Sequence, residues 1–293
     1  MQGMGPTLKL TIHVLLLLQL GGFYVSCEVG PDWCYDLPSC GPKTWASRGY
    51  CNGNKQSPIN IVTRNTLSDA SLGPITILRY EDRMRPKSLT NTGHYAEVLM
   101  KDGATISSPG LPATYGLKSF HFHWGTYRQR GSEHAINGMR YAMELHIVHT
   151  KNNMTMDEAK MDPEGIAVLA FFIKKSSTAP PVYAWKTLAD LLERIPEKGN
   201  SVELKGEFSL GALLSRADLS TYYRYWGSLT TPECNESVIW TVYPDPIEVH
   251  HKVLKKFTNS MYFTTKKENR PMQKNYRPLQ PLNNREVLRF TEI

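Results

Sequence analysis

Residues 119–125 have the sequence Ser-Phe-His-Phe-His-Trp-Gly, in which two histidines flank one phenylalanine inside an apolar run. Side chains at positions i and i+2 of a β-strand point to the same face of the sheet. A strand here would place His121 and His123 side by side and turn the intervening aromatic residues to the opposite face. Two imidazoles on one face can bind one metal ion, so this stretch predicts a buried strand and part of a metal site.

A second stretch, residues 144–149 with the sequence Glu-Leu-His-Ile-Val-His, alternates in the same way. As an antiparallel neighbour of the first strand, it would bring Glu144 and His146 to the face of the histidine pair. Three histidines with an open fourth position are typical of a catalytic zinc site. An isolated His-x-His pair usually binds no metal, so the zinc prediction depends on this second strand. His149 lies at an odd offset from His146, and we expect it to be a hydrogen-bonded core residue.

Most of the remaining chain consists of short strand-like runs separated by Gly and Pro. The clearest runs are residues 58–62, 75–78, 96–100 and 166–173. One helix is expected at residues 184–194, where apolar residues recur at helical spacing and Pro196 follows. No stretch has the composition of an interdomain linker, so the sequence indicates one β-dominated domain over residues 28–293.

The N-terminus has the features of a secretory signal peptide. Lys9 precedes the apolar run of residues 10–20, which is too short to span a membrane comfortably. The sequence Val-Ser-Cys at residues 25–27 fits a cleavage site with small side chains. We therefore expect a signal peptide at residues 1–27. Cleavage after Gly22 and retention as a membrane signal anchor are the alternatives.

Cysteines and glycosylation motifs agree with secretion. Of the five cysteines, removal of Cys27 would leave Cys34, Cys40, Cys51 and Cys234. An even number in an oxidising compartment predicts two disulfides, for which three connectivities are possible. The sequons at Asn153 and Asn235 could carry glycans if they are exposed.

The chain is basic, with a formal net charge of +7. A late cluster of basic residues contains Lys252, Lys255, Lys256, Lys266, Lys267 and Arg270. No nucleic-acid recognition motif accompanies this charge, so we expect a solvated basic face and no nucleic-acid partner. Such a face would favour anionic cell surfaces. His250 and His251 lie among these lysines, and we expect them to be surface residues.

The C-terminal residues 284–293 contain no long apolar tail. The sequence therefore carries no visible membrane span or lipid-anchor signal. We expect a secreted, extracellular monomer that could associate with cell surfaces.

Seven motifs, in this order and spacing, resemble the alpha-class carbonic anhydrases of animals. They are residues 56–61, 91–94, 120–125, 131–134, 144–149, 227–232 and 275–281. The resemblance extends from Trp33 to Phe290. The cysteine arrangement is similar to that of the extracellular, membrane-associated members, which implies the disulfides Cys34–Cys40 and Cys51–Cys234. The implied fold is mainly β (α+β): one domain with a large twisted, mostly antiparallel sheet of about ten strands, a few short surface helices and a cone-shaped cleft.

The resemblance implies a zinc enzyme that reversibly hydrates carbon dioxide to bicarbonate and a proton. His121, His123 and His146 correspond to the Zn²⁺ ligands, and water or hydroxide occupies the fourth position. Thr230 corresponds to the residue that accepts a hydrogen bond from the hydroxide, and Glu133 to the residue that accepts one from Thr230. The same hydroxide could hydrolyse esters as a side activity.

Further residues correspond to positions for substrate binding and proton transfer. Thr231 corresponds to a bicarbonate contact. The apolar wall that would receive carbon dioxide corresponds to Val148, Val168, Leu229 and Trp240. His94 corresponds to the proton shuttle, a role that suits an imidazole with a pKa near 6.5. Taken alone, the threonines would be interpreted as a turn before Pro232, the wall residues as core and His94 as a surface residue.

The zinc ligands also have implied hydrogen-bond partners. Glu144 corresponds to the carboxylate that accepts the N–H of His146, and the backbone carbonyl of Asn275 to the acceptor for His123. Many relatives carry a glutamine where this chain has Ser119. The shorter serine side chain predicts weaker zinc affinity.

A second interpretation is a catalytically silent, carbonic-anhydrase-like binding module. Such modules usually lack a zinc histidine, whereas all three are present here, so the sequence favours the enzyme. Glu233, where cytosolic relatives have proline, is a further departure that could perturb the rim of the site.

Overall fold

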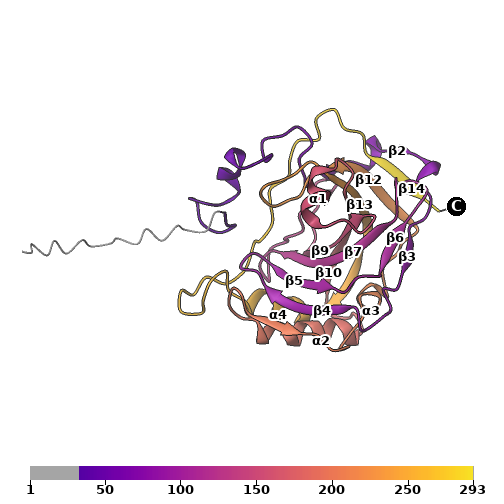
Figure 1. The fold of residues 1–293 in the computed structure, drawn as a ribbon. Helices are drawn as coiled ribbons and strands as arrows, with labels where there is room; N and C mark the ends of the chain where they lie inside the picture. The colour runs from indigo at the N-terminus through magenta and orange to yellow at the C-terminus, as the bar shows by residue number, and fades with distance from the viewer. Residues whose placement is uncertain (1–32, 293) are drawn as a thin grey trace, which may run out of the picture. The chain divides into compact units, whose positions relative to one another are not determined.

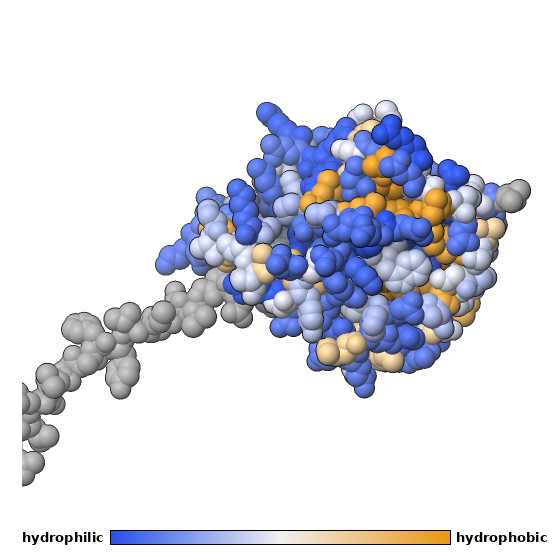
Figure 2. Space-filling model, turned by 90° about the horizontal axis from the view of Figure 1, so that it is seen from above, coloured by the Kyte–Doolittle hydropathy of each residue, from blue (hydrophilic) through white to orange (hydrophobic). Residues whose placement is uncertain are grey.

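The computed structural model describes residues 33–292, and the predicted signal peptide at residues 1–27 lies outside them. Among the helices of the described residues, none combines the length and apolar character that a membrane crossing requires. Hydrophilic residues dominate the face seen in Figure 2, and the hydrophobic ones on that face gather in a band.

Twelve strands within residues 33–292 form one large sheet (Figure 1). The main path through it is β11 (Ser201–Glu203), β4 (Pro86–Asn91), β5 (Ala96–Met100), β7 (Tyr115–Trp124), β9 (Met143–Lys151), β10 (Ile166–Ser176), β13 (Val238–His250), β12 (Thr221–Gly227), β14 (Leu288–Thr291) and β2 (Leu67–Ser68). Beside β7, the sheet is extended by β6 (Thr105–Ser107) and β3 (Thr76–Leu78). Neighbours are antiparallel except for the parallel pairs β10–β13 and β14–β2. The predicted large, mostly antiparallel sheet is confirmed, and very short strands such as β2 account for the number above ten.

The remaining elements are short. A separate parallel pair is formed by β1 (Asn60–Ile61) and β8 (Ala135–Ile136). The α-helices are α1 (Met156–Met161), α2 (Tyr183–Leu191), α3 (Leu210–Leu214) and α4 (His251–Asn259). The 3₁₀ turns are η1 (Pro42–Ser47), η2 (Thr63–Asn65), η3 (Ala70–Leu72) and η4 (Leu192–Arg194). Figure 1 shows α2 and α4 together below the sheet and α1 apart from them.

Alternation along β7 and β9 divides their side chains between two hydrophobic clusters. Phe122 of β7 and Ile147 of β9 belong to the larger cluster, to which α2 and α4 also contribute. The ring of Phe122 lies 5.8 Å from that of Trp185 in α2 and 5.0 Å from that of Phe257 in α4. Val148 belongs to the smaller cluster on the other face. Burying one such side chain contributes about 1.5–3 kcal/mol, so the aromatic residues determine which face of β7 is left for the histidines.

Most of the predicted elements agree with the structure. β5 spans the predicted residues 96–100, and β10 contains the predicted residues 166–173. The predicted helix at 184–194 is α2 followed by η4, and it ends where Pro196 disfavours helical backbone at the preceding residue. The run at 58–62 forms only the two residues of β1: Pro58, at its start, has no amide hydrogen to donate, and Val62, at its end, is the N-cap of η2.

Two disulfides, Cys34–Cys40 and Cys51–Cys234, form in the structure with the pairing that the resemblance implies. The second joins positions 183 residues apart. It attaches the N-terminal segment to the loop that follows β12, where the backbone N–H of Cys234 donates to the carbonyl of Thr231 at 2.8 Å. This disulfide therefore supports the loop that carries Thr230 and Thr231.

Replacement of Cys51 and Cys234 by serine should lower the free energy of unfolding by about 5 kcal/mol, and replacement of Cys34 and Cys40 by only about 2 kcal/mol. The difference follows from sequence separations of 183 and 6 residues, because a cross-link across a longer loop removes more entropy from the unfolded chain. Urea denaturation followed by tryptophan fluorescence would measure both. Equal losses in the two variants would contradict this account.

Candidate active site

Three histidine side chains converge where β7 and β9 pair. The register places His121 directly opposite His146, and His123 lies two residues further along β7 on the same face. One ligand nitrogen from each ring lies within 4.8 Å of those of the other two. The three ring centroids are 4.7–5.3 Å apart. This spacing of imidazole nitrogens fits a single metal ion.

Two of these imidazoles are oriented by hydrogen bonds that leave the other ring nitrogen available. His123 donates from Nδ1 to the backbone carbonyl of Asn275 at 2.7 Å, and His146 donates from Nε2 to Oε1 of Glu144 at 2.7 Å. Among the described residues, the buried Nε2 of His123 has no hydrogen-bond partner. A buried polar atom without a partner is costly, and a metal ion would satisfy it. The donor set therefore fits zinc, which prefers neutral imidazole.

The third imidazole, His121, is held differently. Tyr95 stacks on its ring with centroids 4.4 Å apart. Its Nδ1 is buried and has no hydrogen-bond partner within residues 33–292. Ser119 precedes it by two residues on the same strand, but its hydroxyl interacts with the carboxylate of Glu97. His121 therefore lacks the hydrogen bond that orients each of the other two rings.

The surroundings of His121 and His123 favour the neutral form of each imidazole. Burial, and then the charges of the neighbouring imidazoles, hold the pKa of His121 well below its usual value of 6.5. Burial also lowers the pKa of His123, although the carboxylate of Glu133 acts in the opposite direction. A neutral imidazole is the form that binds a metal ion.

Glu144 is the centre of a buried hydrogen-bond network. Besides the ring N–H of His146, its carboxylate accepts the backbone N–H of His134 at 2.8 Å and the Nδ1–H of the same residue at 2.7 Å. Burial by itself would raise the pKa of Glu144, but the charges and hydrogen bonds of the two imidazoles outweigh it and hold that pKa well below its usual range. The atoms of His134, Glu144 and His146 also lie close enough to hold a metal. They are already paired with one another, so this group supports His146.

His134 lies in the motif at residues 131–134, and the sequence indicated no role for it. Its Nε2 lies 2.6 Å from the hydroxyl of Tyr225, which in turn donates to Ser57 at 2.9 Å. The network therefore continues from the histidine cluster to the N-terminal segment. These contacts join residues that are far apart in the sequence, so they could be found only from the folded structure.

Glu133 and Thr230 both lie at the site, but among the described residues no hydrogen bond joins their side chains. Oε1 of Glu133 accepts the backbone N–H of Arg277 at 2.7 Å, and Oε2 lies 3.5 Å from Nε2 of His123 without a hydrogen-bond partner. Thr230 is buried in the loop after β12 and lines the cavity. The Thr230–Glu133 hydrogen bond stays a prediction, for which Oε2 is the free acceptor.

A cavity of about 290 Å³ opens beside the histidines. Its lining contains all the residues predicted to contact substrate, namely Val148, Val168, Leu229, Thr231 and Trp240. It also contains Glu233 and residues to which the sequence gave no role, namely Trp33, Tyr95, Glu97, Met156 and Lys160. Burial raises the pKa of Glu97, an effect that the Ser119 hydroxyl partly offsets. Glu97 is opposite His121 in the register of β5 and β7, so knowledge of that strand pairing was needed to find it.

His94 is not among the residues that line the cavity, whereas its neighbour Trp33 is. The two rings are stacked, with centroids 3.7 Å apart and an interplanar angle of 10°. Nε2 of His94 also lies 3.2 Å from the Trp33 carbonyl, to which it can donate. Because Trp33 itself lines the cavity, His94 is separated from it by one side chain.

His149 is buried on the opposite face of β9, as expected. Its Nδ1 lies 3.1 Å from the carbonyl of Ala167, and its Nε2 lies 2.5 Å from the hydroxyl of Tyr80. Burial lowers the pKa of His149 to about 4. It is a neutral core residue with both ring nitrogens hydrogen-bonded.

A three-histidine cluster beside a partly apolar cavity, on a large and mostly antiparallel sheet, is an arrangement that could hold one metal ion next to a bound substrate. A sequence model of the eukaryotic-type carbonic anhydrases matches residues 40–291. Carbonic anhydrase 4 of Mus musculus is 37% identical over 286 residues, which cover 94% of this chain and 90% of the relative. Carbonic anhydrase 4 of Oryctolagus cuniculus is 36% identical, covering 93% of this chain and 89% of the relative. Carbonic anhydrase 15 of Mus musculus is 34% identical, covering 93% and 86%.

The chain belongs to the eukaryotic-type carbonic anhydrase family. It is accordingly an enzyme of this class, as the motifs of the sequence indicated. The family match includes β7, β9 and the loop after β12 that carries Thr230 and Thr231.

A Ser119→Gln variant should lose zinc to a chelator about 10- to 100-fold more slowly than the unaltered chain, the usual size of such indirect effects on metal affinity. The longer side chain could accept a hydrogen bond from Nδ1 of His121, which now has no partner in the described chain. The release of zinc into a colorimetric chelator measures the rate. Ser119→Ala is the control and should not slow the release. An unchanged rate in the glutamine variant would exclude this explanation.

The pKa of His94 should lie below its usual value of 6.5. Desolvation by its neighbours lowers the pKa most, and the hydrogen bond to the Trp33 carbonyl only partly opposes this effect. The ring should therefore stay neutral as pH falls through 6.5 and become protonated only in more acidic solution. Titration of its ring protons by NMR measures the midpoint, and a midpoint at or above 6.5 would contradict the structure.

Proposed function

We propose that this chain is a secreted enzyme that uses Zn²⁺ to hydrate carbon dioxide reversibly to bicarbonate and a proton, with His94 as proton shuttle. The observation that carries the proposal is the convergence of His121, His123 and His146 beside a cavity with an apolar wall. A bound zinc ion would lower the pKa of a water molecule to about 7, a value established for carbonic anhydrases in general, and so supply a nucleophile at neutral pH.

The chain's own residues would prepare the metal ligands. Glu144 and the carbonyl of Asn275 fix the ring orientation and the tautomer of His146 and His123, so that Nδ1 of the former and Nε2 of the latter are available. Such partners also raise the basicity of the imidazole.

The cavity wall suits the substrate. Carbon dioxide has no charge and no dipole, so an apolar surface binds it without the cost of removing water from polar groups. Val148, Val168 and Trp240 are buried and line the cavity with Leu229. Thr231 lies on the same lining and would contact the more polar bicarbonate.

Thr230 and Glu133 would orient the attacking oxygen. The Thr230 hydroxyl oxygen would accept a hydrogen bond from the nucleophilic water, while its own proton is donated to Oε2 of Glu133. That carboxylate oxygen is buried and has no hydrogen-bond partner within residues 33–292, which supports the assignment. Only one rotation of the threonine side chain is then compatible with both bonds, so the oxygen is held in one orientation toward the substrate.

His94 would carry the released proton to solvent. It lies one side chain from the cavity, stacked on Trp33. A transfer through water needs the ring to alternate between accepting a proton near the cavity and releasing it outside. A pKa below the usual value favours release to solvent.

The secretory route rests on independent features. The predicted signal peptide and the two disulfides both fit an oxidising compartment. Asn153 is exposed and is the sequon that we expect to carry a glycan. Asn235 is only 5% exposed. Because a glycan needs an exposed asparagine, we expect none at this second sequon in the folded chain. We expect the secreted enzyme to be a monomer.

Stopped-flow measurement of carbon dioxide hydration in dilute buffer tests the proposal. The zinc-loaded protein should be active, a chelator should abolish the activity, and His94→Ala should lower kcat by about 100-fold. Added imidazole should restore kcat in that variant, because it replaces the missing proton carrier. His251→Ala is the matched control, since it removes a histidine from a distant surface, and its kcat should not change.

Background activity in a protein that demonstrably contains zinc would contradict the proposal and indicate a silent binding module. Zinc-dependent activity that is unaffected by His94→Ala would retain the hydration chemistry but exclude the shuttle.

A further inference from the structure

Basic side chains gather where the end of β10, the end of β13 and the start of α4 meet the loop after β7. This basic surface consists of Arg128, Arg130, Lys174, Lys175, His250, His251, Lys252 and Lys255. The arginines and lysines are exposed, and the two histidines are partly exposed. Parallel pairing of β10 with β13 sets Lys175 opposite Val249, one residue from the histidine pair.

Three observations show that these residues share one area. A hollow of about 350 Å³ has in its lining Tyr127 and four residues of the basic surface, namely Arg128, Arg130, Lys174 and Lys175. The Nζ of Lys175 lies 4.3 Å from the centre of the Tyr127 ring and donates to the carbonyl of the same residue at 3.0 Å. Desolvation, and then nearby positive charge, lower the pKa of His251; the charges belong to His250, Lys252, Lys175 and Lys255.

Most of this charge is not neutralised by the chain itself. Within residues 33–292, ion pairs are absent for Arg128, Arg130, Lys175, Lys252 and Lys255. Of the basic surface, only Lys174 has a carboxylate partner, Glu248 at 2.7 Å. The basic surface therefore presents uncompensated positive charge to the solvent.

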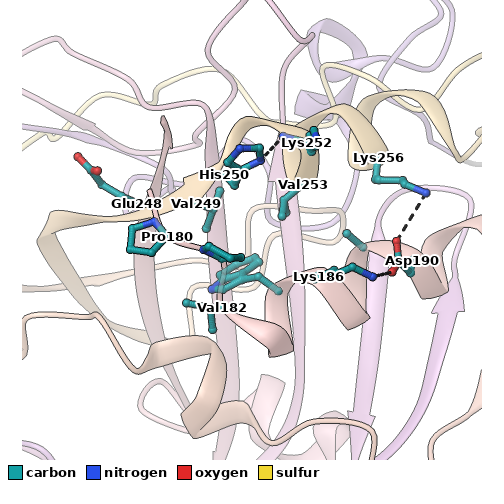
Figure 3. Close-up of a pocket in the computed structure, with 13 residues that line it drawn as sticks. Pro180, Val182, Lys186, Asp190, Glu248, Val249, His250, Lys252, Val253 and Lys256 are labelled. Carbon is teal, nitrogen blue, oxygen red and sulfur yellow. Dashed lines mark hydrogen bonds and ion pairs between the residues drawn. The ribbon is translucent and has the colours of Figure 1, made fainter. Parts of the chain in front are cut away.

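The adjacent groove between α2 and α4 shows the contrast (Figure 3). There Lys186 and Lys256 both reach Asp190, at 2.7 and 3.6 Å. Lys256 also pairs with Glu193 at 2.5 Å. Figure 3 shows Lys252 at the start of α4, away from this carboxylate. Lys186 and Lys256 are thus paired with carboxylates inside the groove, whereas Lys252, which lines the same groove at the start of α4, is not.

The start of α4 departs from the usual preference of helices. Backbone N–H groups make this end of a helix positive, so acidic residues are favoured in the first turn. The first turn of α4 contains no acidic residue and begins with His251 and Lys252. A positively charged side chain at this end is repelled by the partial positive charge of the helix end. A bound anion would interact favourably with both the side chain and the helix end.

We propose that the basic surface binds a linear sulfated polysaccharide. Sulfate groups keep their charge at all physiological pH values and recur along such a chain, which suits cations spread over two strands, a loop and a helix end. The hollow gives a flexible chain a recessed path, and Tyr127, 36% exposed, offers an aromatic surface for a sugar ring. A flat bilayer could not enter this hollow. The proposal relies on secretion, proposed above, but not on catalysis.

The test uses the full secreted protein and a heparin-derived octasaccharide, with binding measured by isothermal titration calorimetry. The triple variant Arg128→Glu, Lys175→Glu, Lys252→Glu should bind about 100-fold more weakly, given the usual contribution of one basic side chain near an anionic surface. The matched control Lys43→Glu, Lys101→Glu, Lys205→Glu makes the same change of net charge at exposed sites outside the basic surface. It should bind nearly as well as the unaltered chain. Carbon dioxide hydration should be unchanged in both variants, because none of these residues lines the catalytic cavity.

Three results would overturn the proposal. Equal weakening in the two triple variants would mean that net charge alone attracts the octasaccharide. Equal binding of an unsulfated hyaluronan octasaccharide would exclude recognition of sulfate. Binding to vesicles of phosphatidylcholine with phosphatidylserine, without binding to the octasaccharide, would assign the basic surface to a membrane.

Discussion

The antiparallel register between β7 and β9 is the constraint on which the site depends. It sets His121 opposite His146, and the period of two along β7 adds His123 on the same face. A slip by one residue would turn every side chain of a strand to the other face. The aromatic residues of β7 would then leave the core that they form with α2 and α4, so the same packing that stabilises the sheet also fixes the ligand set. The convergence of the three histidines and the burial of the aromatic residues are therefore set by one alignment.

Around this alignment lies a shell of buried polar groups. Glu144 carries three hydrogen bonds from His134 and His146, and Glu133 accepts the backbone N–H of Arg277. The guanidinium of Arg277 is itself bonded to Gln56 and to backbone carbonyls of the N-terminal segment. Such groups are expensive to bury unless they are paired. The irregular C-terminal segment thus contributes a backbone N–H to the site at Arg277, whose side chain is held by the N-terminal segment.

Sequence patterns predicted the faces of the strands better than the contacts between them. Alternation was enough to place His121 and His123 together and to turn His149 into the core. The pairing of these strands and the role of Asn275 came from the family resemblance, since periodicity says nothing about which strand is a neighbour. Tyr95, Glu97 and Trp33 at the cavity were not anticipated, because each reaches it through a loop or a strand register that local sequence does not encode. The shuttle role of His94 came from the resemblance and stays a prediction, and its stacking on Trp33 is a tertiary contact that local sequence does not encode.

The Cys51–Cys234 disulfide must form before the loop that carries Thr230 and Thr231 is fully supported. Cys234 and Thr231 share a tight turn, and the cross-link holds that turn against the N-terminal segment. Thr230 and Thr231 are therefore positioned by a bond that a reducing cytosol does not sustain. A chain still on the ribosome has all three histidines but lacks this support for the threonines. On the proposed secretory route, formation of this disulfide would complete the support for the two threonines only after the chain has entered an oxidising compartment.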